Sequence, residues 1–190
     1  MVSKLEESAK VLKATTAQAD LIAKMAAELL ACFKRGNKLM SFGNGGSACD
    51  AQNFADELTG RYERNRPGLP AVALTTNTGD LTSIANDFGF EFVFERPLRA
   101  LAKKGDIAVA ISTSGNSANV LKAAQAAKEL GVTVLGFSGE TGGKLKPLCD
   151  LCLCVPSKSV ARIQEAHIAV IQILCGLIED GMFPDAPKAH

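Results

Sequence analysis

The chain is poor in the residues with which proteins bind nucleic acids or membrane surfaces. It has no tryptophan and a single tyrosine, so it offers no row of aromatic rings on which single-stranded bases could stack. Its 21 basic and 20 acidic residues leave a net charge of +1, which produces no strong field toward a polyanion or an anionic membrane. We therefore expect neither direct binding of nucleic acid nor binding to a membrane.

Long apolar segments are also missing. No run approaches the roughly 20 consecutive apolar residues that span a bilayer. The N-terminus, with Lys4, Glu6 and Glu7, lacks the apolar core of a signal peptide. The composition, 47% hydrophobic and 22% charged, is that of a globular protein, and 190 residues suffice for one domain with a substantial core. We expect a cytoplasmic protein with a single domain over residues 1–190.

Six cysteines occur, but not in the arrangement of a metal or disulfide protein. The densest group, Cys149, Cys152 and Cys154, lies in an alternating run at 148–155 that is typical of a strand rather than of a zinc knuckle. No second pair follows at the spacing of a zinc ribbon, and a cytosolic chain of this size has little need of disulfides. We expect this group to be small core residues, buried or half-buried.

Strand-like and helix-like segments alternate along the chain. Residues 4–34 have helical periodicity and end before Gly36, which predicts an N-terminal helix within residues 1–35. Regular alternation after it predicts an α/β fold, a doubly wound parallel five-stranded sheet flanked by helices. The predicted strands are 38–42, 71–75, 107–111, 133–137 and 151–155, and the predicted helices are 47–58, 80–86, 91–102, 118–130 and 161–180.

Two turns are rich in glycine and hydroxyl groups. Residues 43–47 read Gly-Asn-Gly-Gly-Ser and residues 112–117 read Ser-Thr-Ser-Gly-Asn-Ser, and each turn follows a predicted strand and opens a predicted helix. Free backbone N–H groups and the positive end of the helix dipole make such a turn an anion site. Ligands in this architecture bind beyond the carboxyl ends of strands. We therefore expect a phosphorylated substrate that is held at two points.

The second turn has more hydroxyl groups than helix capping requires. Ser112, Thr113, Ser114 and Ser117 carry four hydroxyls, whereas one side chain suffices to cap a helix. We place the phosphate of the substrate here. A dinucleotide cofactor is disfavoured, because the first turn lacks the full G-x-G-x-x-G spacing and no acidic residue ends the strand at 71–75.

Several motifs together resemble the phosphoheptose isomerases, which are enzymes of the SIS (sugar isomerase) domain class. The motifs lie at 43–52, 57–61, 86–87, 112–117 and 162–165, and the likeness covers nearly the whole chain. The family converts sedoheptulose 7-phosphate to a D-glycero-heptose 7-phosphate, an early step toward lipopolysaccharide. Its members are cytoplasmic homotetramers, and many carry zinc. The resemblance implies the same SIS fold, substrate and assembly here.

The resemblance also implies a set of residues that contact the substrate. Each of these positions holds the residue type that the family pattern requires. They are Asn44, Gly45, Gly46, Glu57, Asn86, Asp87, Ser112, Thr113, Ser114, Ser117 and Gln164.

Two departures from the family pattern concern the reaction centre. The family has His-x-x-x-Glu on the first helix after the glycine turn, whereas this chain has Asn53 and Glu57. On the last helix the family has His eight residues after Gln, whereas here Gln164 is followed by Gln172. Both histidines are zinc ligands in the family, and the second is its usual general acid/base. A carboxamide is a poor zinc ligand, so we expect no zinc, or weakly bound zinc at Glu57 and Gln164.

The only nearby histidine does not fill the gap. His167 lies three residues after Gln164, but relatives have a histidine in this same context beside the catalytic one. A lone histidine on a packed helix has either a structural or interface role or a role in the site, and the sequence leaves both open.

Aldose–ketose isomerisation moves a proton between adjacent carbons through an enediol, and Glu57 is the expected base. Gln172 cannot transfer a proton at neutral pH, but it can orient a substrate oxygen. Three functions stay open. The first is a phosphoheptose isomerase of reduced activity, and Glu57, Gln164 and the two turns favour it. The missing imidazoles favour the others: a non-catalytic SIS protein that binds a sugar phosphate or the replication initiator, or an isomerase of another sugar phosphate.

Overall fold

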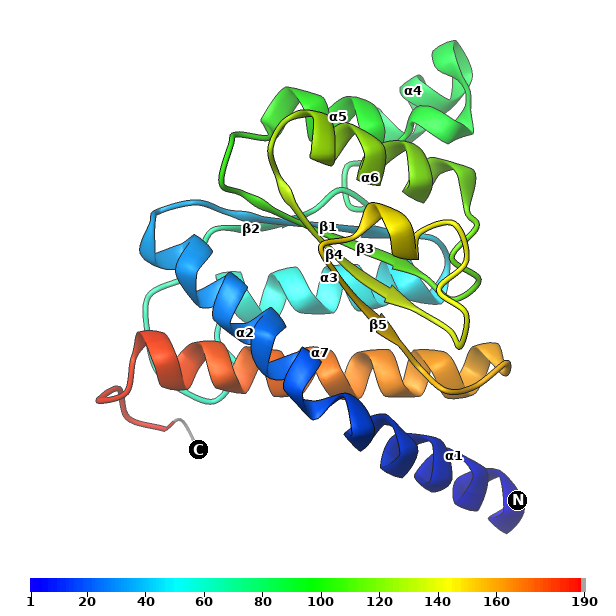
Figure 1. Cartoon of the computed structure of the whole chain (residues 1–190). Helices are drawn as coiled ribbons and strands as arrows, with labels where there is room; N and C mark the ends of the chain where they lie inside the picture. Colours follow the sequence, from blue (N-terminus) through cyan, green and yellow to red (C-terminus); the bar gives the residue numbers. More distant parts are fainter. Residues whose placement is uncertain (189–190) are drawn as a thin grey trace.

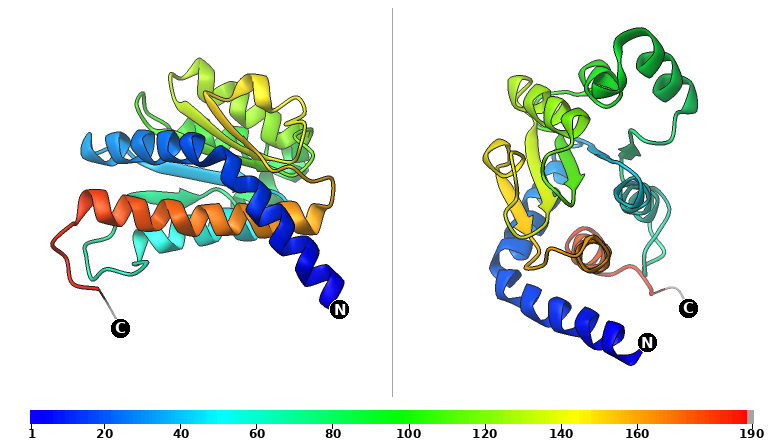
Figure 2. Two further views of the ribbon diagram at one scale, coloured as in Figure 1. Left: turned by 60° about the horizontal axis from the view of Figure 1, so that its bottom comes forward. Right: turned by 90° about the vertical axis from the view of Figure 1, so that its right-hand side faces the viewer.

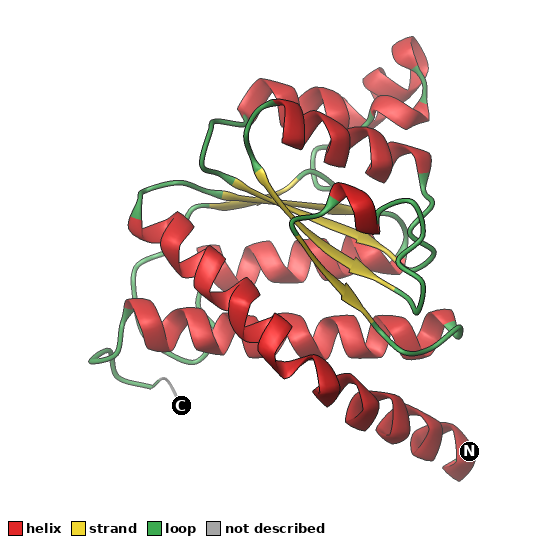
Figure 3. Ribbon diagram, in the orientation of Figure 1, coloured by secondary structure: helices red, strands yellow, loops and turns green. Residues whose placement is uncertain are grey.

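The predicted sheet is confirmed by the computed structural model, which describes residues 1–188; Ala189 and His190 lie outside the described residues. Five parallel strands lie in the order β2-β1-β3-β4-β5 (Figure 1, Figure 3). The strands are β1 (Leu39–Gly43), β2 (Ala71–Ala73), β3 (Ile107–Ser112), β4 (Thr133–Ser138) and β5 (Leu151–Cys154).

The strand order places both glycine- and hydroxyl-rich turns at one crevice. The chain leaves β1 toward β2 on one side and returns to β3 on the other side of β1, so the direction of winding reverses between β1 and β3. Gly43 pairs in register with Ile111, and Ser112 pairs with Ser138. The carboxyl ends of β1 and β3 therefore lie side by side at the topological switch, where ligands bind in such sheets.

Helices cover both faces of the sheet. On one face, Phe54, Leu29 and Leu174 belong to a core formed with α2, α3 and α7, and on the other Phe42, Phe94 and Val120 belong to a core formed with α5 and α6 (Figure 1). The helices are α1 (Val2–Thr15), α2 (Ala19–Lys34), α3 (Gly46–Thr59), α4 (Thr78–Phe88), α5 (Glu95–Leu101), α6 (Ala118–Glu129) and α7 (Val160–Met182), with short 3-10 turns η1 (Thr16–Gln18), η2 (Phe90–Phe92) and η3 (Lys146–Leu148).

The expected N-terminal helix is present but divided by η1. The hydroxyl of Thr15 donates to the carbonyl of Val11 at 2.9 Å, and that of Thr16 donates to Lys13 at 2.7 Å. Such back-bonding competes with the helical hydrogen bonds and bends helices, which explains the break at this point. As a result α1 extends away from the body, while α2 packs on the sheet (Figure 2).

The predicted helix at 91–102 is also divided, into η2 and α5. Pro97 lies at the third position of α5, within the first turn, where a missing N–H costs nothing. In one continuous helix over 91–102, Pro97 would lie in the second turn, and its ring would clash with the turn before it. The helix therefore restarts at Glu95, just before the proline.

One helix departs from the expectation that no segment could span a membrane. By length and composition α7 is long and apolar enough to do so. It packs against α2 and α3 and buries residues such as Ile171, Leu174 and Ile178, as a core helix does.

A buried ion pair fixes α7 to the end of α3. Arg66 Nε donates to Glu179 Oε1 at 2.9 Å, and both side chains are almost fully buried. The Arg66 guanidinium also donates to the carbonyls of Glu57 and Leu58 at 2.7 and 2.6 Å. Burial opposes ionisation of Glu179, but hydrogen bonds from three backbone N–H groups at 62–64 and the charge of Arg66 outweigh it and lower its pKa.

Removal of this carboxylate is expected to destabilise the protein strongly. Glu179→Gln would leave Arg66 buried and unpaired, and breaking such a pair costs roughly 3–5 kcal/mol. Asp180→Asn is the matched control, because Asp180 is exposed and pairs with Arg64 at the surface; its cost is expected to be about 0–1 kcal/mol. Urea unfolding monitored by circular dichroism measures both, and equal costs for the two variants would contradict the assignment.

Candidate active site

Three side chains meet between α3 and α7, which lie side by side (Figure 1). Gln172 Nε2 donates to Asn53 Oδ1 at 2.8 Å and lies 3.3 Å from Glu57 Oε1. All three residues are half-buried, so a ligand can reach them. The structure thus brings together the expected base and the two amides at positions where the resemblance implies histidine.

Gln164, the other α7 residue expected in the site, lies near the N-terminus of α7, beside the N-terminus of α3. A Cβ at Gly46 would lie 2.3 Å from Gln164 Nε2, so a larger residue there would displace the glutamine side chain from its position against the N-terminus of α3. Gly45, just before the helix, has a φ of +57°, a conformation that glycine adopts without strain. The first turn is therefore shaped for close approach of a ligand to its backbone.

In the second turn, hydrogen bonds within the turn orient the hydroxyl groups of Ser112, Ser114 and Ser117. Ser112 Oγ lies 3.1 Å from Ser117 Oγ, and Ser114 Oγ accepts a hydrogen bond from Asn116 N at 3.1 Å. Ser117 is the N-cap of α6, yet its side chain makes no capping bond among the described residues. These hydroxyls, with Thr113 in the same turn, surround the N-terminus of a 12-residue helix, which is suited to an anion.

A residue that the sequence analysis missed joins the two turns. Asn44 and Asn119 exchange two hydrogen bonds, at 2.8 and 2.9 Å, and Asn119 is buried. Its Oδ1 also accepts from the backbone N–H of Val120. The only sequence signal for this residue is an asparagine just inside a helix that is otherwise apolar on that side. The pair holds the turns after β1 and β3 at a fixed separation.

Two expected residues lie apart from the others. Asn86 and Asp87 are exposed on α4, and Asn86 Nδ2 donates to Asp87 Oδ1 at 2.8 Å. Helix α4 has no fully buried residue and extends beyond α5 and α6 (Figure 1, Figure 2). Within residues 1–188 neither side chain forms a hydrogen bond with Asn53, Glu57 or Gln172.

The contacts of His167 are those of a structural residue. Its side chain is fully buried, Nε2 lies 3.2 Å from the carbonyl oxygen of Ser138, and the ring meets Phe137 edge-on. Burial lowers its pKa to about 4, so the imidazole is neutral at physiological pH. Of the two roles that the sequence left open, the structure favours packing at the end of β4.

The residues at the positions where the resemblance implies zinc ligands do not fit zinc. They supply one carboxylate, Glu57, and three amides, and the Gln172 N–H donates toward Asn53 and Glu57 where a metal ligand would present a lone pair. No group of three His, Cys, Asp or Glu side chains within residues 1–188 has an arrangement that could hold a metal ion.

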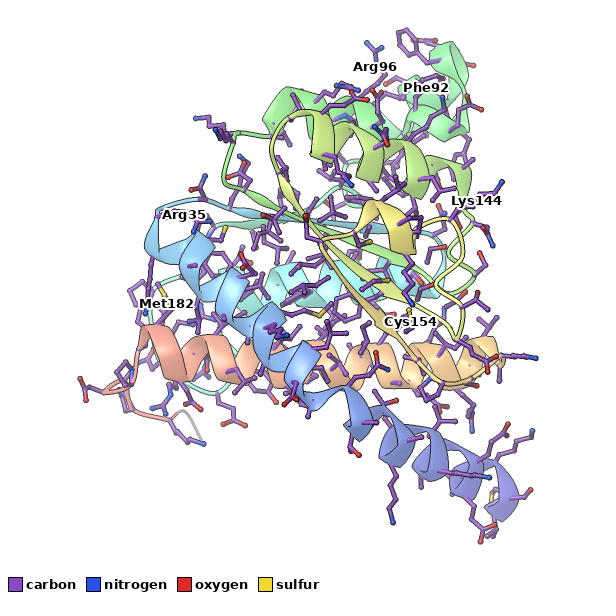
Figure 4. All side chains as sticks on the ribbon, viewed as in Figure 1. Arg35, Phe92, Arg96, Lys144, Cys154 and Met182 are labelled. Atoms are coloured by element: carbon purple, nitrogen blue, oxygen red, sulfur yellow. The ribbon has the colours of Figure 1, made fainter. Side chains whose placement is uncertain are left out.

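The three clustered cysteines at 149–154 are free thiols in half-buried positions. Cys152 and Cys154 follow each other on β5 with their sulfur atoms 3.9 Å apart, and Cys154 is labelled in Figure 4. Burial raises the pKa of Cys154 to about 11, which leaves it protonated and a poor metal ligand. With Cys149, all three are half-buried, as expected for small core residues.

Comparisons with known proteins agree on one family. Residues 5–139 match the SIS domain family. The chain is 53% identical over 162 residues to a phosphoheptose isomerase of Trichlorobacter lovleyi, covering 85% of this chain and 83% of the relative. It is 52% identical over 175 residues to one of Helicobacter hepaticus, covering 92% and 87%.

Solved structures give the same result. A phosphoheptose isomerase from Neisseria gonorrhoeae has a TM-score of 0.90 at 42% identity and covers 94% of this chain and 96% of its own. One from Francisella tularensis has a TM-score of 0.91 at 35% identity, covering 94% and 95%. With these matches over most of its length, the chain belongs to the phosphoheptose isomerases of the SIS domain family.

Proposed function

We propose that this protein is an aldose–ketose isomerase that converts sedoheptulose 7-phosphate to D-glycero-D-manno-heptose 7-phosphate. The observation that carries the proposal is the position of Glu57, half-buried beside Gln172 on helices that begin near the two anion-binding turns. High identity to phosphoheptose isomerases over most of the chain supports this substrate. The catalytic unit is a single SIS domain over residues 1–190.

In the proposed reaction the phosphate binds at the turns, through backbone N–H groups and the hydroxyls of Ser112, Thr113, Ser114 and Ser117. The carboxylate of Glu57 takes a proton from C1 of the ketose, and the electron pair forms the C1–C2 double bond of the enediol. The C2 carbonyl oxygen takes up the proton of the C1 hydroxyl, and return of the abstracted proton from Glu57 to C2 gives the aldose. Gln172 donates an N–H to a substrate oxygen but transfers no proton.

The missing imidazoles set the expected rate. Loss of one general acid/base costs about 10²–10⁴ in rate, so activity is expected to be lower than in relatives that retain the histidine. No step is assigned to zinc, because the donor set does not suit it. The remaining contacts of the proposed substrate site are Asn44, Gly45, Gly46, Asn86, Asp87 and Gln164.

An apolar groove supports a homotetramer. It lies between the α1–α2 segment and α7 and has a volume of about 330 Å³. Ile173 and Leu177 on α7 are 52% and 41% exposed, which is unusual for large apolar side chains of a helix in the core. We propose that other copies of the chain cover this groove in a cytoplasmic tetramer, and that the product enters lipopolysaccharide synthesis.

The rival function is a non-catalytic protein that binds sugar phosphates, and the absence of both imidazoles favours it. Turnover separates the two. We expect slow formation of the aldose from sedoheptulose 7-phosphate, with and without a zinc chelator. Glu57→Gln is expected to lower turnover by at least about 10²-fold, since it removes the base. Asp56→Asn, an exposed neighbour on α3, is the control and is expected to retain turnover. Full activity in Glu57→Gln would refute the mechanism.

Restoring the histidines is expected to restore the family's site. Asn53→His together with Gln172→His supplies two nitrogen donors beside Glu57, so zinc affinity and turnover should both rise. Metal content after dialysis against zinc and the turnover rate measure the two effects. A wild-type protein that purifies with stoichiometric zinc at this site would contradict the proposal.

The assembly proposal predicts a tetrameric mass in light scattering at micromolar concentration. Ile173→Asp places a charge in the apolar groove and is expected to shift the mass toward smaller species. Glu165→Asp, a conservative change outside the groove on the same helix, is expected to leave the mass unchanged. A monomeric wild-type mass would end the proposal.

A further inference from the structure

Asp50 is a buried carboxyl group that the fold does not use. Only 8% of the residue is exposed, and among the described residues its Oδ2 has no hydrogen-bond partner. Burial raises the pKa of this carboxyl to about 6. A buried polar atom without a partner costs stability, and most such atoms in native proteins are satisfied. Asp50 thus has an unfilled acceptor for which packing gives no reason.

Its position on α3 directs it to the side that forms the site. Asp50 precedes Asn53 by three residues and Glu57 by seven, spacings that place all three on one side of a helix. That side faces α7, since Asn53 and Glu57 both lie within hydrogen-bond distance of Gln172. Gly46, four residues before Asp50, contacts Gln164 on α7. Asp50 therefore lies on the stripe of α3 that lines the α3–α7 contact.

The distances along the helix match the middle of a sugar phosphate. At about 1.5 Å per residue, Asp50 lies about 6 Å from the start of α3 at Gly46 and about 10 Å from Glu57. The Asn44–Asn119 pair joins the start of this helix to the proposed phosphate site at Ser112–Ser117, and the proposed base is at Glu57. Between these two ends the substrate carries only hydroxylated carbons.

We propose that Asp50 is a specificity-determining residue, whose carboxylate accepts a hydrogen bond from a hydroxyl on the carbon chain between the phosphate and the reacting carbons. The proposal rests on the proposed function for the identity of the sugar. A carboxylate accepts hydrogen bonds from hydroxyl groups and is unsuited to a phosphate, which it repels. Asp50 therefore recognises the polyhydroxylated chain and not the anion.

The test compares two ligands in binding experiments that need no turnover. Asp50→Asn keeps the shape and loses the charged acceptor. We expect calorimetry to show about 10- to 100-fold weaker binding of sedoheptulose 7-phosphate, the range of a hydrogen bond to a charged group. Inorganic phosphate, which lacks the carbon chain, should bind Asp50→Asn as it binds the wild type. Asp56→Asn, exposed on the same helix, should bind both ligands normally.

Each result decides the proposal. Unchanged affinity of Asp50→Asn for the sugar phosphate overturns it, and so does an equal loss for both ligands, which indicates a structural role. A wild type that binds the sugar phosphate no better than phosphate also overturns it. If light scattering shows that Asp50→Asn alters the assembly, Asp50 belongs to a subunit contact instead. Weaker sugar binding in Asp50→Asn without any wild-type turnover would support the residue's role and refute the isomerase.

Discussion

The relative position of α3 and α7 depends on the buried pair of Arg66 and Glu179. The carboxylate of Glu179 holds the backbone at 62–64 as well as the guanidinium, and that guanidinium holds the last turn of α3 through the carbonyls of Glu57 and Leu58. Because Glu57 is on that last turn, the Arg66–Glu179 pair also sets the position of Glu57 along α3 relative to Gln172. The Arg66–Glu179 pair, which is costly to bury, thus fixes the relative position of α3 and α7, which an apolar contact alone would leave undefined.

The opposite end of the site depends on the sheet. Parallel strands β1 and β3 end side by side, and the chain turns into a helix after each. Two glycine-rich turns alone would not hold a fixed separation, because glycine leaves the backbone free. The reciprocal amide pair of Asn44 and Asn119 supplies the missing constraint. The protein then sets the distance between a phosphate bound at these turns and the base Glu57. Binding of the phosphate therefore also positions the reacting carbons of the substrate at the base.

The sequence predicted the sheet, both turns and the α3–α7 residues, because each has a local signal: an apolar run, a glycine turn, or a fixed spacing along one helix. It did not predict Asn119, whose role exists only because two segments 75 residues apart meet. The break between α1 and α2 was missed because it depends on which way the hydroxyls of Thr15 and Thr16 point. The family was predicted from motifs. Asn86 and Asp87, which the resemblance places in the substrate site, form no hydrogen bond with Asn53, Glu57 or Gln172 within residues 1–188.

The amides at the two positions where the family pattern implies histidine are best understood as one coupled change. Asn53 accepts the hydrogen bond that Gln172 donates, so each amide satisfies the other in a half-buried position. If only one had changed, a histidine would face an amide, with a poorer match of donors and acceptors and an incomplete metal site. Relative to the pattern that the resemblance implies, the site has a hydrogen-bonded amide pair in place of a metal-binding pair of imidazoles, and the carboxylate of Glu57 lies within reach of an N–H donor. A carboxylate beside a neutral donor retains the elements of proton abstraction from carbon, a base and a group to stabilise the enediolate oxygen, but not the second proton carrier.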